Sequence, residues 1–252
     1  MPELLFWPAL VAYGEAAVAY SSARFSALGT WGVRVGWLAQ TALLAFQAGR
    51  AEGFPWSSWA GSLNLFVWLV VSTYLIWGCR PRFRLLGLSV MPLVVALFVA
   101  ARLGGGTETG DRPHYGNLFL VVHVGCVLAA FAGFTLAAGL AGLYLLEERR
   151  LKRRAADILR LRLPSLVALE RLTKRTIAVS LPLLTLGLVA GFVRLREHGG
   201  GVDALMAATL AAWAVYAIFL GVRPAGRNGA HLAIVGFVLV IVVRVALAGT
   251  HF

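Results

Sequence analysis

Long blocks of apolar residues constrain this chain more than any other feature of its sequence. A helix needs about 20 apolar residues to cross the hydrocarbon core of a bilayer. Eight blocks of suitable length lie near residues 4–21, 32–49, 60–79, 85–103, 117–146, 176–194, 204–221 and 230–249. Because 60% of the residues are apolar and only 13% are charged, a soluble enzyme domain is excluded. The sequence predicts one all-α integral-membrane domain over residues 1–252, a polytopic bundle of eight transmembrane helices.

The positions of the basic residues predict the orientation of the bundle, because loops rich in Lys and Arg stay in the cytoplasm. Seventeen of the 23 Lys and Arg residues fall in the loops of one side and five in those of the other. Both termini are therefore expected outside. After the fifth span, LPSLVALERLTKR at 163–175 begins near a proline and has leucines at helical spacing. This pattern predicts a short amphipathic helix at the cytoplasmic interface between the fifth and sixth transmembrane helices.

The net charge of +12 raises the question of which partners the chain binds. Most basic residues lie beside membrane helices, where anionic lipid headgroups attract them, so we expect a lipid bilayer as partner and no nucleic acid. The run LEERRLKRR at 146–154 is the densest. Two interpretations of the segment 146–175 stay open: it only determines topology, or it also docks a cytoplasmic partner.

Patterns of other chemistry are missing from the sequence. It holds two cysteines, Cys79 and Cys126, but no CxxC or CxxCH motif, which excludes a thiol–disulfide carrier and a c-type cytochrome. No Ser/His/Asp, paired-carboxylate or phosphate-loop constellation points to another enzyme, so whether the chain is an enzyme stays open. No internal repeat supports an inverted-repeat transporter.

Two of the five histidines approach the outer side of the membrane from different helices. His123 lies six residues inside the fifth span, about 9 Å deep at 1.5 Å per residue. His251 follows the last span, which runs outward. Such a pair can serve as ligands of a metal, here at His123 and His251, although a membrane histidine can equally form a hydrogen bond between helices.

Arg244 strengthens the case for an outer cavity. It precedes His251 by seven residues, two helical turns, and therefore shares its face if the helix persists. A guanidinium inside a span marks a functional cavity by default. An amphipathic porphyrin would satisfy these groups, with iron between the imidazoles and a propionate on Arg244. Alternatively, Arg244 reaches the outer surface or pairs with a carboxylate such as Asp203 or Asp111.

At these residues the sequence resembles the cytochrome c assembly proteins, a family that includes CcsA, HemX and YpjD. The stretch 123–154 resembles the family's histidine-led helix that ends in a basic segment. LPSLVALERLTKRTIAVSLPLLTLGLVAG at 163–191 is similar to the segment that follows it, and GFPWSSWAGSLNLFVWLVV at 53–71 to the entry of the third span. The final AGTHF resembles the family's closing histidine.

The resemblance implies a role in presenting heme. In that family two outer-face histidines flank a tryptophan-rich loop, the WWD domain, and ligate heme on its way to apocytochrome c. By resemblance, His123 and His251 would ligate a transient b-type heme, and Asp203 would match the aspartate of the loop. The implied partners are heme, apocytochrome c and a second cytochrome c assembly membrane protein. The implied location is a bacterial inner (plasma) membrane, crossed several times.

The chain departs from the family pattern at three places. EHGGGV at 197–202 replaces the tryptophans that would shield a porphyrin. Gly221 stands where heme-exporting members have a membrane histidine, and Gln40 stands where some relatives have one. The resemblance therefore implies a divergent heme-binding member that acts as an accessory or regulatory factor.

Two other hypotheses for the function remain. The first is a HemX-like membrane regulator that acts through its basic cytoplasmic segment without turning over heme. The second, with little support beyond Glu15 and Arg244, is a small-solute transporter.

Overall fold

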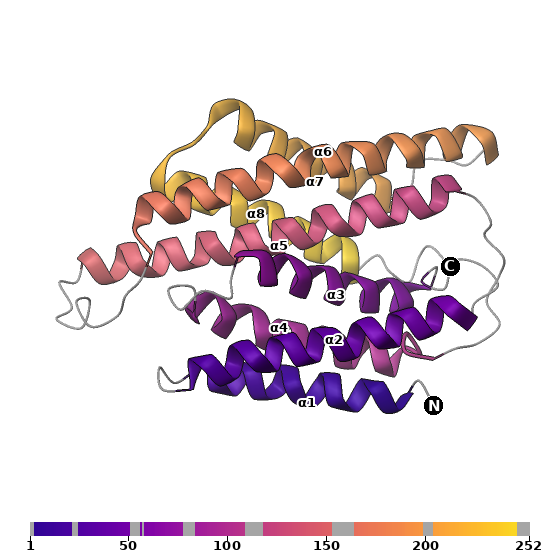
Figure 1. Cartoon of the computed structure of the whole chain (residues 1–252). Helices are drawn as coiled ribbons and strands as arrows, with labels where there is room; N and C mark the ends of the chain where they lie inside the picture. Colours follow the sequence, from indigo (N-terminus) through magenta and orange to yellow (C-terminus); the bar gives the residue numbers. More distant parts are fainter. Residues whose placement is uncertain are drawn as a thin grey trace. The chain divides into compact units, whose positions relative to one another are not determined.

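Eight helices make up the part of the chain that the computed structural model describes, residues 3–21, 25–50, 56, 58–77, 84–108, 118–152, 164–198 and 204–245. No strand occurs in these ranges. The helices are α1 (Glu3–Ala19), α2 (Ser26–Arg50), α3 (Trp59–Trp77), α4 (Arg84–Leu103), α5 (Leu118–Lys152), α6 (Leu166–His198), α7 (Ala204–Val222) and α8 (Gly226–Val245) (Figure 1). Each coincides with one apolar block of the sequence, which confirms the predicted all-α class.

The lengths and compositions of these helices are those of a multi-pass membrane protein. Four apolar stretches are long enough to cross a bilayer: Trp59–Ile76, Leu86–Leu103, Val121–Lys152 and Leu166–Val193. Three shorter apolar helices cover Leu4–Ala19, Met206–Val222 and Gly226–Ile241. α2 falls in neither of these groups, and it carries Arg34, Gln40 and Gln47. Eight crossings with both termini outside stay a prediction.

The prediction of a separate amphipathic helix at 163–175 is wrong. Residues 166–175 form the start of α6, which continues without a break to His198. The helix therefore runs through the expected boundary near residue 176, and within it the hydroxyls of Thr173, Thr176 and Ser180 each donate to the carbonyl four residues earlier. With 33 residues at 1.5 Å each, α6 is about 50 Å long, more than the roughly 30 Å hydrocarbon core requires.

The chain divides into two compact units, residues 1–124 and 125–252. In the first unit α1 packs on α2 and α4, and α3 packs on α2 and α4. Three glycines of α2 let α1 approach closely: Gly29 and Gly36 lie under the rings of Tyr20 and Tyr13, and Gly32 lies against the backbone of Ala12. The hairpin of α1 and α2 is therefore held by close contact over several turns.

In the second unit α6, α7 and α8 pack against one another. The rings of Phe134 on α5 and Tyr216 on α7 stack with centroids 3.7 Å apart and planes 9° from parallel. On α8, a Cβ added at Gly236 would lie 2.6 Å from Cζ of Tyr216, so the tyrosine is packed tightly against this backbone. Tyr216 also donates its hydroxyl proton to the carbonyl of Ala233 at 3.2 Å. The buried middle of α5 is thereby joined to α7 and α8.

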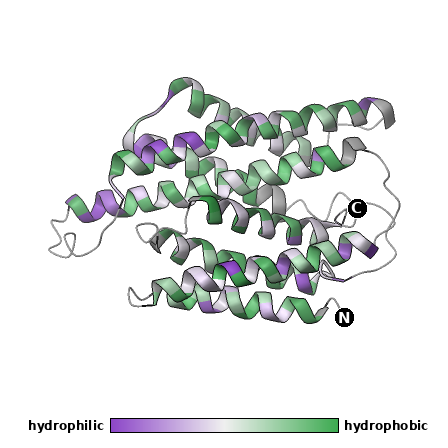
Figure 2. Cartoon of the chain, viewed as in Figure 1, coloured by the Kyte–Doolittle hydropathy of each residue, from purple (hydrophilic) through white to green (hydrophobic). Residues whose placement is uncertain are grey.

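Hydrophilic residues gather at one end of this second unit. Figure 2 shows them at the end of α5 and at the start of α6. The last turn of α5 carries Arg149, Arg150 and Lys152. These are the residues that the positive-inside rule predicts at the cytoplasmic face.

Candidate functional site

The predicted heme ligands lie only partly in the described structure. His123 is in the second turn of α5 and is half-buried. Arg244 belongs to the last turn of α8, where only the backbone is described. His251 and Asp203 lie outside the described residues. A pocket shared by His123 and His251 therefore stays a prediction.

The start of α5 is loosely packed. Val121 and Val122 are 38% and 41% exposed, and from residue 121 onward, where side-chain burial is described, the first buried residue is Leu128. A Cβ added at Gly125 would have no heavy atom of another part of the chain within 4 Å. From Leu128 onward, in contrast, most residues of α5 are buried up to Leu143. α5 is therefore anchored by its middle, and its exposed position at residue 121 and its open position at residue 125 lie on the opposite face of the helix from the half-buried His123.

A buried polar network joins α1, α2 and α3 in the first unit. Gln40 is completely buried, and the hydroxyl of Tyr13 donates to its Oε1 at 2.8 Å. Its Nε2 donates to the carbonyl of Asn64 at 3.1 Å and to Oδ1 of the same residue at 2.9 Å. Both ends of the Gln40 amide are therefore engaged. Gln40 therefore serves as a hydrogen-bonded link between helices α1, α2 and α3.

The same network continues to the loop that follows α4. Gln47, also buried, donates from Nε2 to the carbonyls of Gly106 at 3.1 Å and Glu108 at 3.2 Å. Asn64 Nδ2 donates to the carbonyl of Gly106 at 3.2 Å and to Gln47 Oε1 at 3.4 Å. Trp56 donates its indole proton to Gln47 Oε1 at 3.3 Å. Two amide side chains thus bind the loop that leads from α4 toward α5.

Sequence reasoning missed this network. Gln40 and Gln47 were visible as polar residues in a weak span, but their partners come from α1, α3 and a loop far along the chain. The sequence did contain one indication of the network, namely the two glutamines, because amide side chains in a membrane helix need hydrogen-bond partners.

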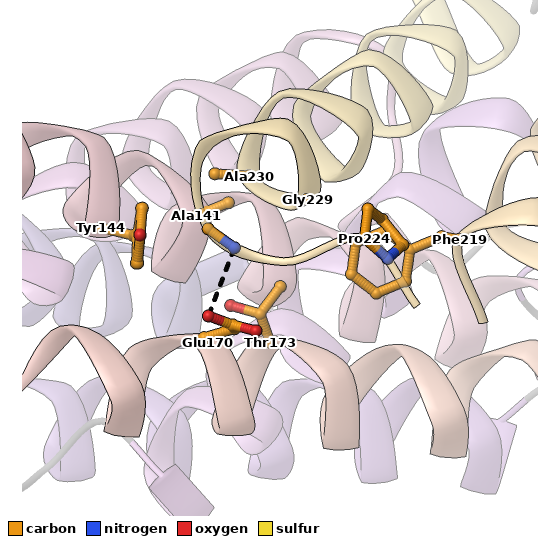
Figure 3. A pocket seen from close by; sticks show the side chains of 9 residues that line it. Ala141, Tyr144, Glu170, Thr173, Phe219, Pro224, Gly229 and Ala230 are labelled. Atoms are coloured by element: carbon orange, nitrogen blue, oxygen red, sulfur yellow. Dashed lines mark hydrogen bonds between the residues drawn. The ribbon is translucent and has the colours of Figure 1, made fainter. Parts of the chain in front are cut away.

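A small pocket lies among the helix ends of the second unit that carry the basic residues. Its wall includes Tyr144 of α5, Glu170 and Thr173 of α6, and Gly226 at the start of α8 (Figure 3). Glu170 Oε2 accepts a hydrogen bond from the backbone N–H of Gly226 at 3.3 Å, and Lys174 Nζ contacts Oε1 at 2.7 Å. The carboxylate thereby caps the start of α8 from a neighbouring helix and fixes the beginning of α6.

The basic segment 146–175 is described up to Lys152 and again from Pro164. Arg149 and Arg150 are exposed at the end of α5, and Arg171 and Arg175 at the start of α6. The turn between α7 and α8 adds further exposed basic residues, Arg223 and Arg227. The residues between 153 and 163 lie outside the described part.

Of the two residues named for the transporter hypothesis, Glu15 and Arg244, the structure describes only the side chain of Glu15. Glu15 lies on an exposed face of α1 rather than in a cavity. Nor do three or more His, Cys, Asp or Glu side chains gather as metal ligands anywhere within the described ranges.

Comparison with known proteins gives matches over most of the chain. Residues 56–247 match the family described as "Cytochrome C assembly protein". The chain is 26% identical over 292 aligned residues to "Cytochrome c biogenesis protein CcsA" of Microcystis aeruginosa, covering 94% of this chain and 89% of the relative. It is 27% identical to the protein of the same name from Guillardia theta, covering 74% and 71%. It is also 28% identical to "Protein HemX" of Brevibacillus brevis, covering 62% and 58%.

Proposed function

The chain belongs to the cytochrome c assembly protein family, and from that premise we propose that it binds heme at the outer face of the membrane as an accessory or regulatory member. The match over residues 56–247 carries this proposal. The loosely packed start of α5, where the half-buried His123 lies, supports it, because a bound ligand could order these turns without disturbing the buried middle of the helix.

The proposed donor set fits the chemistry of an iron porphyrin. The imidazoles of His123 and His251 would hold a b-type heme without a covalent bond to the porphyrin. The guanidinium of Arg244 offers a bidentate partner for a propionate, and Asp203 would complete the polar rim. Heme supplies the redox-active iron when it is bound. The chain itself would hold the porphyrin, orient it and exclude water.

The glycine-rich stretch 197–202 is the reason to propose an accessory role. Aromatic side chains stack on a porphyrin and shield it, and glycines cannot. We expect heme to be held chiefly through its axial ligands and propionates, and to exchange readily. The proposed partners are apocytochrome c and a second cytochrome c assembly membrane protein. The proposed location is a bacterial plasma membrane, with eight crossings and both termini outside.

An absorption spectrum tests the heme proposal. The protein is purified from heme-replete membranes, and the ratio of Soret absorbance to protein absorbance is measured. We expect a Soret band that His123→Ala and His251→Ala each reduce strongly. The matched control is His231→Ala, because His231 is exposed at the start of α8 and accepts a hydrogen bond from Arg227 at 3.4 Å. A protein without a Soret band, or a band that all three variants leave unchanged, would exclude the proposal.

A second candidate function is regulation through the basic cytoplasmic segment. One observation favours it. Glu170 near the start of α6 accepts a hydrogen bond from the backbone N–H of Gly226 at the start of α8, so the two helix ends that carry exposed basic side chains are held together. The neutralising variant replaces Arg149, Arg150, Arg153 and Arg154 with Gln. We expect it to lose a cytoplasmic partner in a pull-down while it still inserts in the membrane. Retention of the same partner by the variant would exclude this function.

A further inference from the structure

The exposed face of α1 contains a carboxylate among apolar side chains. Leu4, Trp7, Val11 and Val18 are 59–72% exposed and lie on one face at helical spacing. Glu15 lies on the same face and is also exposed. It forms no hydrogen bond and no ion pair with any residue of the described ranges. Lipid chains can cover the leucine, valines and tryptophan, but they leave a carboxylate without a partner.

α2 presents the opposite charge at a similar depth. Arg34 is exposed, and its guanidinium lies 5.1 Å from the ring centroid of Trp31. α1 and α2 are antiparallel, and Gly32 of α2 lies against Ala12 and Ala16 of α1. Arg34 follows Gly32 by two residues, so it lies within about one helical turn of Glu15 in depth.

The two charges lie on opposite flanks of one surface. Arg34 is two residues from both Gly32 and Gly36, which face α1. At 100° per residue it is about 200° from each glycine, and it therefore points away from α1. Between Arg34 and α1 lies the exposed apolar face of α2, formed by Leu28, Trp31, Val35 and Leu38. Within one chain the carboxylate and the guanidinium are thus separated by the width of α2.

We propose that this surface binds a second copy of the chain, with Glu15 of each copy paired with Arg34 of the other. A two-fold axis along the membrane normal keeps every residue at its depth and exchanges the two flanks of the surface. Such an axis through the exposed face of α2 brings each carboxylate opposite the guanidinium of the second copy. Both charges gain a partner, and the apolar face of α2 is buried between them. The surface is self-complementary, which selects a second copy over an unrelated membrane protein.

Charge reversal gives a test that distinguishes pairing between copies from effects within one chain. Glu15→Arg copies carry two positive flanks and repel one another, and Arg34→Glu copies carry two negative flanks. We expect each single variant to lower the association constant in liposomes by about tenfold or more, the effect of about 1.4 kcal/mol. A mixture of the two variants restores both ion pairs, and it should form heterodimers as stable as the wild-type dimer. Single-molecule photobleaching with two dyes measures both quantities.

The matched control is Arg196→Glu. Arg196 is also an exposed arginine, and its guanidinium lies 4.8 Å from the ring centroid of Phe192, but it belongs to the C-terminal end of α6 and not to the surface of α1 and α2. It should leave dimerisation unchanged. If the reversed variants do not fold, Glu15→Gln and Arg34→Gln replace them, and each should still weaken association. The proposal would be overturned if the wild type were monomeric, or if the association constant were the same for all of these variants. So would a different membrane protein that copurifies in equal amount and is lost on Glu15→Gln.

Discussion

Replacing Asn64 with leucine tests how much the buried polar network stabilises the first unit. Three hydrogen bonds of the side chain would be lost: one accepted from Gln40 Nε2 at 2.9 Å, and two donated, to Gly106 O at 3.2 Å and to Gln47 Oε1 at 3.4 Å. A hydrogen bond between membrane helices contributes about 0.6 kcal/mol on average. A buried one in proteins generally contributes about 1 kcal/mol. Three bonds therefore give a loss of about 2–3 kcal/mol in the free energy of unfolding.

The loss should not be larger, because each partner keeps another hydrogen bond. Gln40 Nε2 still donates to the backbone carbonyl of residue 64, and the carbonyl of Gly106 still accepts from Gln47. Gln47 Oε1 still accepts from Trp56. Leaving a buried polar group without any partner would add about 1–3 kcal/mol for each group, but this substitution leaves none of these atoms in that state.

Reversible unfolding in mixed micelles, followed by circular dichroism, measures the change. The matched control is Asn228→Leu, because Asn228 is exposed on α8 and the described structure gives its side chain no hydrogen bond. The control should stay within about 0.5 kcal/mol of the wild type. A second readout is the labelling of a cysteine placed at Glu108, which should become faster in the Asn64→Leu background. If Asn64→Leu lowers the free energy of unfolding no more than the control does, the network does not hold the loop that follows α4.

Two further predictions concern the second unit. Gly236→Ala should lower the free energy of unfolding by about 1–3 kcal/mol, because the new Cβ would lie 2.6 Å from Cζ of the tightly packed Tyr216. Gly142→Ala, where the Cβ meets nothing within 4 Å, should instead raise stability by up to about 1 kcal/mol; equal effects in the same unfolding assay would contradict the packing argument. Glu170→Ala should cost about 1 kcal/mol and increase hydrogen exchange at the amide of Gly226, whereas Glu170→Gln, which can still accept that bond, should leave the exchange closer to wild type.

The helices were predictable because their apolar blocks are long, but several of their ends were not. Hydropathy marks the part of a helix that is buried in lipid, and a helix can continue beyond it. α2 begins at Ser26 rather than near residue 32, and α6 begins at Leu166 rather than near residue 176. At the start of α6, Thr173 and Thr176 donate their hydroxyl protons to carbonyls one turn earlier, so these polar side chains are satisfied inside a helix that continues through residues that the sequence assigns to the interface.

The place of His123 near the start of α5 followed from the sequence, because the apolar block fixes roughly where that helix begins, whereas its depth in the membrane stays a prediction. Hydrogen bonds between residues of separate helices could not be predicted from the sequence in the same way. Nothing local in the sequence indicates that Gln47 binds carbonyls of residues 106 and 108, since that choice depends on how α2 and α4 pack. The same holds for Glu170 and Gly226, which are 56 residues apart.

Two contacts, one before α5 in the sequence and one in the middle of α5, limit how His123 can be positioned. The carbonyl of Glu108 is bound by Gln47, and nine residues of sequence then lead to the start of α5 at Leu118. Further along, the stack of Phe134 on Tyr216 fixes the middle of α5. Along the chain, His123 lies between these two contacts, in the first turns of α5. A ligand bound there would order those turns at little cost to the rest of the fold, because the packing that stabilises α5 begins only at Leu128. Loss of the ligand should therefore alter hydrogen exchange at residues 121–127 and leave residues 130–141 unchanged.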